Sequence, residues 1–383
     1  MNLILDQALI DGFRGKVNEN KLFQQLHKDI NGKNSWNIIC SAMDWITTTV
    51  EGIPSIKLKH TNLGFNAIQS LNLMQYVVSL DLLVESIKKL YKVMDNGVEY
   101  PLYYDQSVFN KGINDDVYFK QIRAVFGTHP IDLNTFDGIT KNKGERFYAS
   151  WSATDSLEND DFHVLIYSDD PAKDKQIEFG VSINKINEYA EKRYRLLIEL
   201  SAKVDTILQS HIDTYKAEVI TSVSNPIEQL DILLEENKNR FSETGGYVNQ
   251  IHYIRRILKT KTSTGFDGDP AIIQGYKDFL LALIPVIKEG LQKMDPNHLD
   301  WKITSTGKEF ELINNYIYSV MGDHGQRGQK LYERLIEKGI LPSYLLTNFE
   351  KDEMQLVFDA ILHREWSRLS QKVTYEDLLN LAP

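Results

Sequence analysis

The chain has 383 residues, of which 42% are hydrophobic and 25% are charged, and its formal net charge is −10 at pH 7. These values are ordinary for a globular protein and leave room for two or three domains, while the negative charge argues against broad, sequence-independent binding to nucleic acid. The single cysteine, Cys40, excludes an intrachain disulfide and a cysteine-based zinc cage, and it favours a cytoplasmic location. No stretch reaches the roughly 18 apolar residues of a membrane span and no basic leader begins the chain, so we expect no membrane segment.

The first part of the chain predicts a bundle of helices. Helical patterns cover residues 2–13, 18–30 and 35–52, and a longer pattern covers residues 62–94. This last helix is apolar on more than one face, which is typical of a helix buried among neighbours, and we expect it to be the spine of the bundle. Residues 1–140 contain 13 basic and 15 acidic residues, a balance of −2, so most of the negative charge lies in the remainder of the chain.

A basic group precedes the longest of these helices. Lys57, Lys59 and His60 lie in the loop that follows Pro54. Cationic side chains in such a loop would bind the phosphates of a substrate, and the alternative is an ordinary solvated loop. We therefore regard the three residues as candidate substrate-binding residues.

Residues 114–130 carry the strongest functional signal. Asn114 is a suitable helix cap, and Asp115 and Asp116 would place negative charge in the first turn, where the helix dipole favours it. Arg123 lies at the edge of the apolar face of this helix. His129 directly precedes a proline that is suited to the first position of a following helix, which would place the imidazole near a helix N-terminus and favour its neutral form.

The spacing of Arg123 and His129 resembles the Arg-x(4–6)-His motif of HEPN domains, helical modules found in many prokaryotic RNA-cleaving toxins and antiviral defence proteins. The resemblance covers about residues 1–145, and Ala124 stands where that family often has a polar residue. It implies a metal-independent endoribonuclease without a cofactor, in which Arg123 holds the phosphate and His129 transfers a proton. It also implies RNA as a partner and a homodimer that brings two such pairs together. The alternative is structural, with Arg123 in an ion pair with Asp116 or Asp132 and His129 capping a helix.

The pattern changes from helix to strand after residue 145. Residues 147–152, 162–168 and 177–183 alternate or cluster as strands and are separated by turn residues, which predicts a small antiparallel three-stranded sheet within residues 146–183. Residues 184–222 then form one long helix with a heptad seam of the coiled-coil type. Pro226 restarts the chain, and residues 227–241 can pack back antiparallel, so residues 184–242 predict a long helical hairpin that binds a second copy or a protein partner.

Residues 243–383 predict a C-terminal helical domain. The segment GDHGQRG, residues 322–328, reads as a flexible loop and lacks the lysine and the preceding strand of a phosphate-binding loop. The sequence shows no metal-binding or cofactor motif. The expected fold is mostly α: a helical bundle with a small three-stranded sheet and a long helical hairpin. Besides an endoribonuclease that serves as the toxin or effector of a bacterial antiviral defence system, the alternative function is a noncatalytic helical scaffold that acts through residues 184–242.

Overall fold

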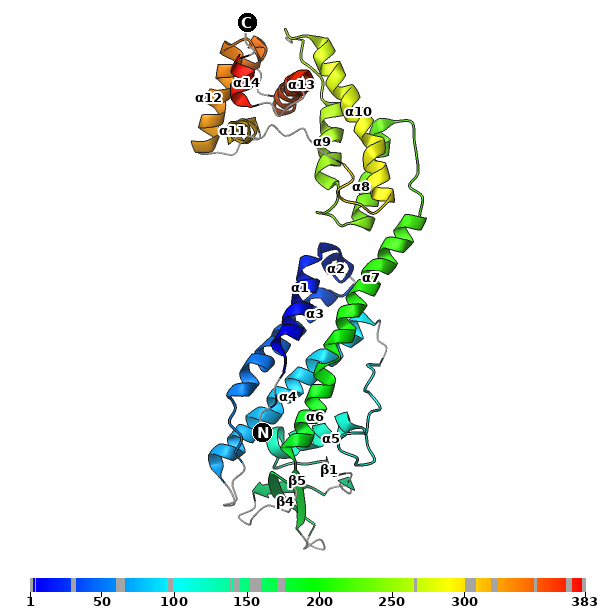
Figure 1. Cartoon of the computed structure of the whole chain (residues 1–383), viewed down its shortest axis with the longest axis vertical. Coiled ribbons are helices and arrows are strands. Elements are labelled where there is room, and N and C mark those ends of the chain that lie inside the picture. Colours follow the sequence, from blue (N-terminus) through cyan, green and yellow to red (C-terminus); the bar gives the residue numbers. More distant parts are fainter. Residues whose placement is uncertain are drawn as a thin grey trace. The chain divides into compact units, whose positions relative to one another are not determined.

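The computed structural model describes residues 3, 5–28, 32–59, 66–95, 99–137, 139–140, 145–151, 160–170, 176–264, 267–299, 308–317, 323–347, 350–369 and 374–380. The fold is mostly α with a small three-stranded antiparallel sheet, as expected (Figure 1). The chain forms two compact units, Met1–Gln209 and Ser210–Pro383. This division differs from the four predicted segments 1–145, 146–183, 184–242 and 243–383, because the sheet and the first part of the expected hairpin share the core of the first unit.

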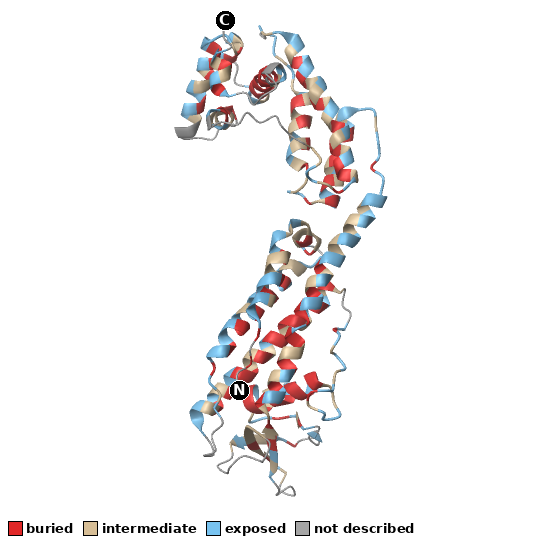
Figure 2. Ribbon diagram, in the orientation of Figure 1, coloured by how far each residue is buried: buried red, intermediate tan, exposed pale blue. Residues whose placement is uncertain are grey.

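The first unit is a helical bundle organised around one central helix. Its helices are α1 (Gln7–Glu19), α2 (Lys21–Leu26), α3 (Ser35–Gly52), α4 (Ala67–Met94), α5 (Asp115–Arg123), α6 (Ile183–Tyr194) and the first part of α7 (Leu197–Ala217). Helices α3, α5 and α6 all pack against α4, whose buried residues cover much of its circumference (Figure 2). The predicted spine is therefore confirmed.

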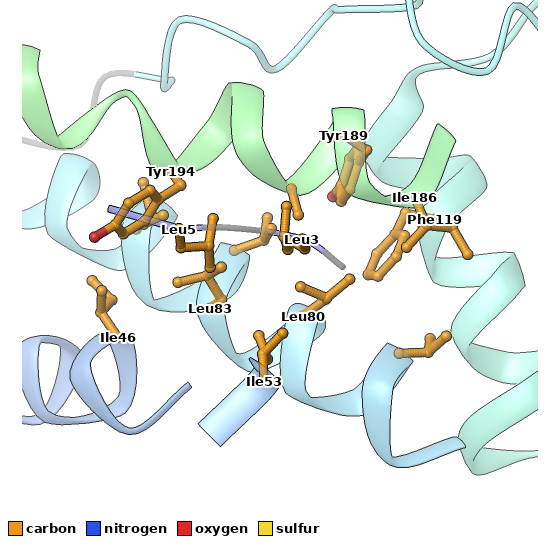
Figure 3. Close-up of a cluster of buried hydrophobic side chains, with 14 of the residues drawn as sticks. Leu3, Leu5, Ile46, Ile53, Leu80, Leu83, Phe119, Ile186, Tyr189 and Tyr194 are labelled. Atoms are coloured by element: carbon orange, nitrogen blue, oxygen red, sulfur yellow. The ribbon is translucent and has the colours of Figure 1, made fainter. Parts of the chain in front are cut away.

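Caps explain where several of these helices begin. The Asn66 side chain accepts a hydrogen bond from the Gln69 amide and so starts α4, and the Asn34 side chain accepts one from the Asn37 amide at the start of α3. Leu80 and Leu83 of α4 lie in the core with Tyr189 and Tyr194 of α6, and Figure 3 shows these side chains gathered between the helices. Burial of this apolar surface is the main favourable contribution to folding of the unit.

The sheet lies at one end of this bundle (Figure 1). Strands β3 (Phe147–Trp151), β4 (Phe162–Ser168) and β5 (Ile177–Val181) pair in the order β3-β4-β5, with Phe147 opposite Ser168 and Val164 opposite Phe179. The predicted strands are confirmed. A second pairing, between β1 (Thr135–Phe136) and β2 (Ile139–Thr140), was not evident from so short a pattern. Val164, Ile166 and Phe179 are buried with the helical residues, so one face of the sheet closes the core of the bundle.

A buried charge network holds α5 to α6. Asp116 accepts hydrogen bonds from the Tyr100 hydroxyl, the Tyr189 hydroxyl at 2.9 Å and Nε of Arg193 at 2.8 Å, and Lys88 lies 3.3 Å from the same carboxylate. The Arg193 side chain is fully buried, and its guanidinium stacks 3.8 Å from the centroid of the Tyr189 ring. Asp116 is therefore a core residue that pairs with distant groups and not a surface charge serving the helix dipole.

Asp115 is also buried and also has a structural partner. Its carboxylate accepts hydrogen bonds from the backbone amides of Val108 and Phe109 at 3.0 and 3.1 Å, so it fixes the loop that leads into α5. Asn114 makes no capping hydrogen bond with its side chain, contrary to expectation; its Oδ1 accepts from the side-chain amide of Gln106 at 3.5 Å.

The predicted long hairpin is arranged differently from a coiled coil. The helix expected over residues 184–222 is interrupted between α6 and α7, and the boundary between the two units falls inside α7. Seam residues Ala190, Leu197 and Val204 are buried in the core of the first unit, whereas α8 (Pro226–Arg240) packs against α9 and α10. The heptad pattern thus reflects packing within a bundle, which the same spacing of apolar residues also satisfies.

The C-terminal end of α7 is held by two buried or partly buried polar side chains of the second unit. Arg240 is fully buried and donates to the backbone carbonyls of Tyr215 and Glu218, while its Nε pairs with Glu236 at 2.9 Å. Gln292 donates to the carbonyls of Lys216 and Glu218 at 3.0 and 2.9 Å. These donors satisfy carbonyls that would otherwise lack partners at the end of the helix.

All the regular secondary structure described in the second unit is helical. It contains α8, α9 (Val248–Lys259), α10 (Pro270–Gln292), α11 (Lys308–Ile317), α12 (Asp323–Glu337), the short 3₁₀-helix η3 (Ser343–Leu346), α13 (Lys351–Leu369) and α14 (Tyr375–Asn380). The glycine-rich segment expected to be a loop becomes the first turns of α12 from residue 323 onward. Within α12, Gly328 faces the backbone of α11, where a side chain would not fit.

Gly328→Ala should therefore destabilise the second unit. A Cβ at this position would lie 1.9 Å from the carbonyl oxygen of Leu312, and α11 and α12 would have to separate. We expect the free energy of unfolding to fall by about 1–3 kcal/mol, measured by hydrogen exchange of α11 and α12 in increasing urea. Gly275→Ala on α10 is the matched control, since nothing lies within 4 Å of its Cβ position, and it should gain up to about 1 kcal/mol from helix propensity. Equal effects at the two positions would contradict the packing argument.

A buried carboxyl group lies between α9, α10 and α13. Asp359 accepts hydrogen bonds from the Tyr253 hydroxyl and from the Gln355 amide, and Tyr253 also contacts the Tyr276 hydroxyl at 2.7 Å. Burial raises the pKa of Asp359 to about 6 from its ordinary 3.8, despite the two hydrogen bonds that oppose the shift. Oε1 of Gln355 is buried, and no described residue forms a hydrogen bond with it.

Asp359→Asn should stabilise the second unit near neutral pH. The pKa of Asp359 is higher in the folded state than in the unfolded state, so burial of this group costs no stability below about pH 4, where it is protonated in both states. The free energy of unfolding then falls as the pH rises through about 6 and the buried group becomes charged. An asparagine carries no charge, so we expect a gain of about 2–3 kcal/mol at pH 7 that disappears near pH 4. Urea unfolding of both proteins across this range measures it. A difference that does not change with pH would show that the charge of Asp359 is not its cause.

Among the residues that the structure describes, two helices, α4 and α10, are long and apolar enough to cross a membrane by length and composition alone. Both contribute buried residues to the core of their own unit, and the core helix of a globular protein passes the same test. The absence of a membrane segment stays a prediction.

Candidate functional site

Arg123 and His129 are joined by an unusual turn. Arg123 is the last residue of α5, and the chain continues as a π-helical turn, η2 (Ala124–Thr128), which His129 closes by donating its backbone amide to the carbonyl of Ala124 at 2.9 Å. A π-helical turn contains one residue more than an α-helical turn and recurs at functional sites. The turn packs against α4, with Val78 of α4 3.2 Å from the position of a Cβ at Gly127.

The Arg123 side chain is held by an acidic residue of α4. Its Nη1 donates to Asp81 at 2.6 Å, and the two side chains are 32% and 13% exposed. Nε of Arg123 is buried and has no hydrogen-bond partner among the residues that the structure describes. The structural alternative from the sequence had Asp116 or Asp132 as the acidic partner of Arg123. Asp116 instead pairs with Arg193, and Arg123 pairs with Asp81, which lies 42 residues earlier in the chain.

His129 is exposed, and within the described part of the chain its imidazole makes no hydrogen bond or ion pair. Its backbone is fixed on both sides, because its carbonyl accepts from the Asp132 amide at 3.1 Å and Leu133 forms a bridge with Phe147 of β3. Pro130 does not begin a helix, contrary to expectation: the chain turns there toward β1. His129 is therefore not at a helix N-terminus, and that reason for a neutral imidazole does not apply.

Ala124 is partly buried against the core of the first unit. It lies in the first position of the π-helical turn, on the side that faces the bundle. The small apolar residue found here thus has a packing role, and a polar side chain at this position would have to be accommodated at the edge of that core.

Lys57 and Lys59, the candidate substrate-binding residues before α4, lie away from Arg123. Lys57 and Lys59 are exposed, and their backbone is tied to the start of α4, where Asn72 donates to the Lys57 carbonyl and Gln69 accepts from the Lys59 amide. Gln69 and Asp81 are a little over three turns apart on α4, which corresponds to about 18 Å along the helix axis. His60 lies outside the described residues. Lys57 and Lys59 could therefore contact only a substrate that extends along α4.

A small cavity of about 220 Å³ lies elsewhere in the first unit, between α5, β5 and α6. Its polar lining comes from Asp137, Asp160 and Glu178 together with Lys111 and Lys185, and Lys111 pairs with Asp137 at 2.7 Å. Burial raises the pKa of the Asp160 carboxyl group. Among the residues that the structure describes, no group of three or more histidine, cysteine or acidic side chains is arranged to hold a metal ion. The cavity does not include Arg123 or His129.

The structure places Arg123 at the end of α5 and His129 directly after the π-helical turn, and their pairing in one site stays a prediction. The sequence did not indicate the residues that surround them. Asp81 gave no signal, because an acidic residue in a long helix is typical of a solvated position, and α4 contains a second one, Glu85. No protein-family model, curated protein or solved structure matches this chain.

Proposed function

We propose that the chain is a metal-independent endoribonuclease of the HEPN type and acts as the toxin or effector of a bacterial antiviral defence system. The observation that supports this best is the π-helical turn, which keeps an accessible, unpaired imidazole six positions after an arginine whose guanidinium is oriented by Asp81. An arginine held on one side by a carboxylate keeps further N–H donors for a phosphate.

In this reaction the ribose 2′-hydroxyl attacks the adjacent phosphorus, and the bond from phosphorus to the 5′-oxygen breaks. One product ends in a 2′,3′-cyclic phosphate, and the other begins with a 5′-hydroxyl. His129 either removes the proton of the attacking hydroxyl or supplies the proton of the departing oxygen. Arg123 stabilises the negative charge that grows on the phosphate oxygens.

A single Arg123 and His129 pair supplies only one of the two proton transfers, so the proposal includes a homodimer with two pairs. An apolar stripe on α4 supports it. Ile68, Leu71, Met74 and Leu82 are exposed on the helix that carries Asp81, at spacings that place them on one side of it. A surface of this kind is usually covered by a partner, and a second copy seated there would lie beside the Arg123 site.

The test is incubation of the purified chain with RNA in the presence of a chelator. We expect cleavage products with 2′,3′-cyclic phosphate ends, and we expect His129→Ala to lose this activity. Cleavage that requires an added divalent metal ion, or that survives in both His129→Ala and Arg123→Ala proteins, would remove the proposal.

The ion pair between Arg123 and Asp81 also favours a second candidate, a noncatalytic helical scaffold. In that case Arg123 serves only to hold α5 on α4, and residues 184–242 bind a protein partner. This candidate predicts that the chain cleaves no RNA. It also predicts that the protein partner still binds the Arg123→Lys variant but no longer binds when surface residues of α7 and α8 are changed.

A further inference from the structure

A larger cavity, of about 840 Å³, opens in the second unit between α9 and the start of α13. One face of α9 supplies most of its wall, with Asn249, His252, Arg256 and Lys259 at spacings of three and four residues. The wall continues through Lys261, and the opposite side is acidic. The volume lies in the range of sites that bind small molecules.

The acidic side chains of this cavity already have partners. Asp352 pairs with Arg256 at 2.8 Å. Glu353 is buried and accepts from the Ser263 amide at 2.6 Å and from the Tyr344 hydroxyl at 2.9 Å. Glu350 also has a polar contact. The carboxylates therefore shape the cavity and orient Arg256 more than they attract a metal ion.

Three basic side chains of this cavity form no hydrogen bond or ion pair with the described residues. His252, Lys259 and Lys261 are exposed, and none of them has a hydrogen bond or an ion pair within the described residues. Arg255 also lines the cavity and pairs with Asp231 at 2.5 Å from outside it. The lining thus has four basic side chains against three acidic ones, and among the residues described Lys259 and Lys261 are the two lysines of the cavity without an ion-pair partner.

The floor of the cavity is rigid and partly aromatic. The guanidinium of Arg256 lies 5.7 Å from the centroid of the Tyr253 ring, and the Tyr253 hydroxyl is directed to Asp359 in the core. Arg256 is thus fixed by an aromatic ring and by Asp352. A pre-positioned guanidinium binds a phosphate at a lower entropic cost than a mobile one.

We propose that this cavity binds a small phosphate ester of nucleotide size. Its phosphates contact Lys259, Lys261 and Arg256, and its hydroxyl groups donate to the carboxylates on the opposite side. An ester fits better than a nucleic-acid strand, because the three acidic residues would repel a continuous phosphate backbone but accept hydrogen bonds from a sugar. The inference is independent of RNA cleavage at Arg123 and His129, which belong to the other unit.

The experiment is titration calorimetry of the full chain with ATP, with tripolyphosphate and with adenosine. We expect ATP to bind, adenosine not to bind, and the affinity for ATP to fall when salt is raised from 50 to 200 mM, by roughly the several-fold change that a few phosphate contacts produce. The double variant Lys259→Ala/Lys261→Ala should weaken ATP binding by at least about tenfold, which corresponds to one or two lost charge-assisted hydrogen bonds.

The matched control is Lys330→Ala/Lys338→Ala, which removes the same charge from exposed positions of the second unit outside the cavity. It should leave ATP binding unchanged, and so should Arg123→Ala. No binding of ATP at millimolar concentration, or equal loss in both double variants, would overturn the site. Tripolyphosphate binding as tightly as ATP would overturn the assignment of an ester. A short single-stranded RNA that binds more than tenfold tighter than ATP would overturn the small-molecule assignment and mark a nucleic-acid interface.

Discussion

Arg193→Met is expected to lower the free energy of unfolding of the first unit by about 3–5 kcal/mol, because it leaves the buried carboxylate of Asp116 without its main partner. Burial alone would raise the pKa of Asp116, but Arg193, Tyr100 and Lys88 outweigh it and keep the pKa below its ordinary value. The stabilisation is therefore present above the ordinary aspartate pKa of about 4 and is lost as the pH falls through the lower folded value.

The measurement is hydrogen exchange of α4 and α6 in increasing urea, which reports on the first unit separately from the second. Arg195→Met is the matched control, since Arg195 is two residues away, is 69% exposed and forms an ion pair with Glu191 on the helix surface; we expect a change of less than about 0.5 kcal/mol. Adding Asp116→Asn to Arg193→Met should restore part of the loss, because the unpaired charge is then removed. A loss equal to that of the control would show that the network contributes little to stability.

His129→Ala is expected to reduce RNA cleavage by about 100- to 10,000-fold, the range for removal of a group that transfers a proton. Arg123→Ala should lose about 100- to 1,000-fold, the range for removal of one donor to a developing negative charge. Arg123→Lys should retain the ion pair with Asp81 but not the forked donors, so we expect intermediate activity and unchanged stability.

Single-turnover cleavage of a labelled RNA, with a chelator present, measures these changes. Arg195→Ala is again the control for loss of a surface arginine and should cleave at the wild-type rate. Mixing His129→Ala with Arg123→Ala protein adds a test of the dimer: if each copy supplies one intact residue to a shared site, the mixture should be more active than either variant alone. A mixture no more active than its components would contradict a shared site.

The elements that were predicted well are those whose signals are local. The strands follow from alternation of side chains, as in residues 177–181, where Phe179 and Val181 are buried. The start of α8 follows from Pro226, which restarts the chain and occupies the first position of the helix. Neither depends on residues that are distant in the sequence, so the pattern was sufficient.

The missed features depend on contacts between distant residues. The ion pair between Asp116 and Arg193 joins residues 77 positions apart, and the pair between Asp81 and Arg123 joins residues 42 positions apart. No local sequence pattern indicates either pair. Nothing in the residues of η2, AVFGT, distinguishes a π-helical turn from an α-helical one. In the second unit, the spacing of His252, Arg256 and Lys259 indicates a cationic face on α9, but the acidic wall that completes the cavity comes from residues about 90 positions later.

The way in which α7 ends limits how the protein can be divided for experiments. A fragment that begins after Glu218 would deprive Arg240 of the carbonyl oxygens of Tyr215 and Glu218 and leave a guanidinium in the interior without its acceptors. A fragment that ends at Gln209 would stop in mid-helix and expose an unfinished turn. Separate expression of the C-terminal half should therefore start several residues before Tyr215, even though this duplicates part of a helix that the N-terminal half also needs.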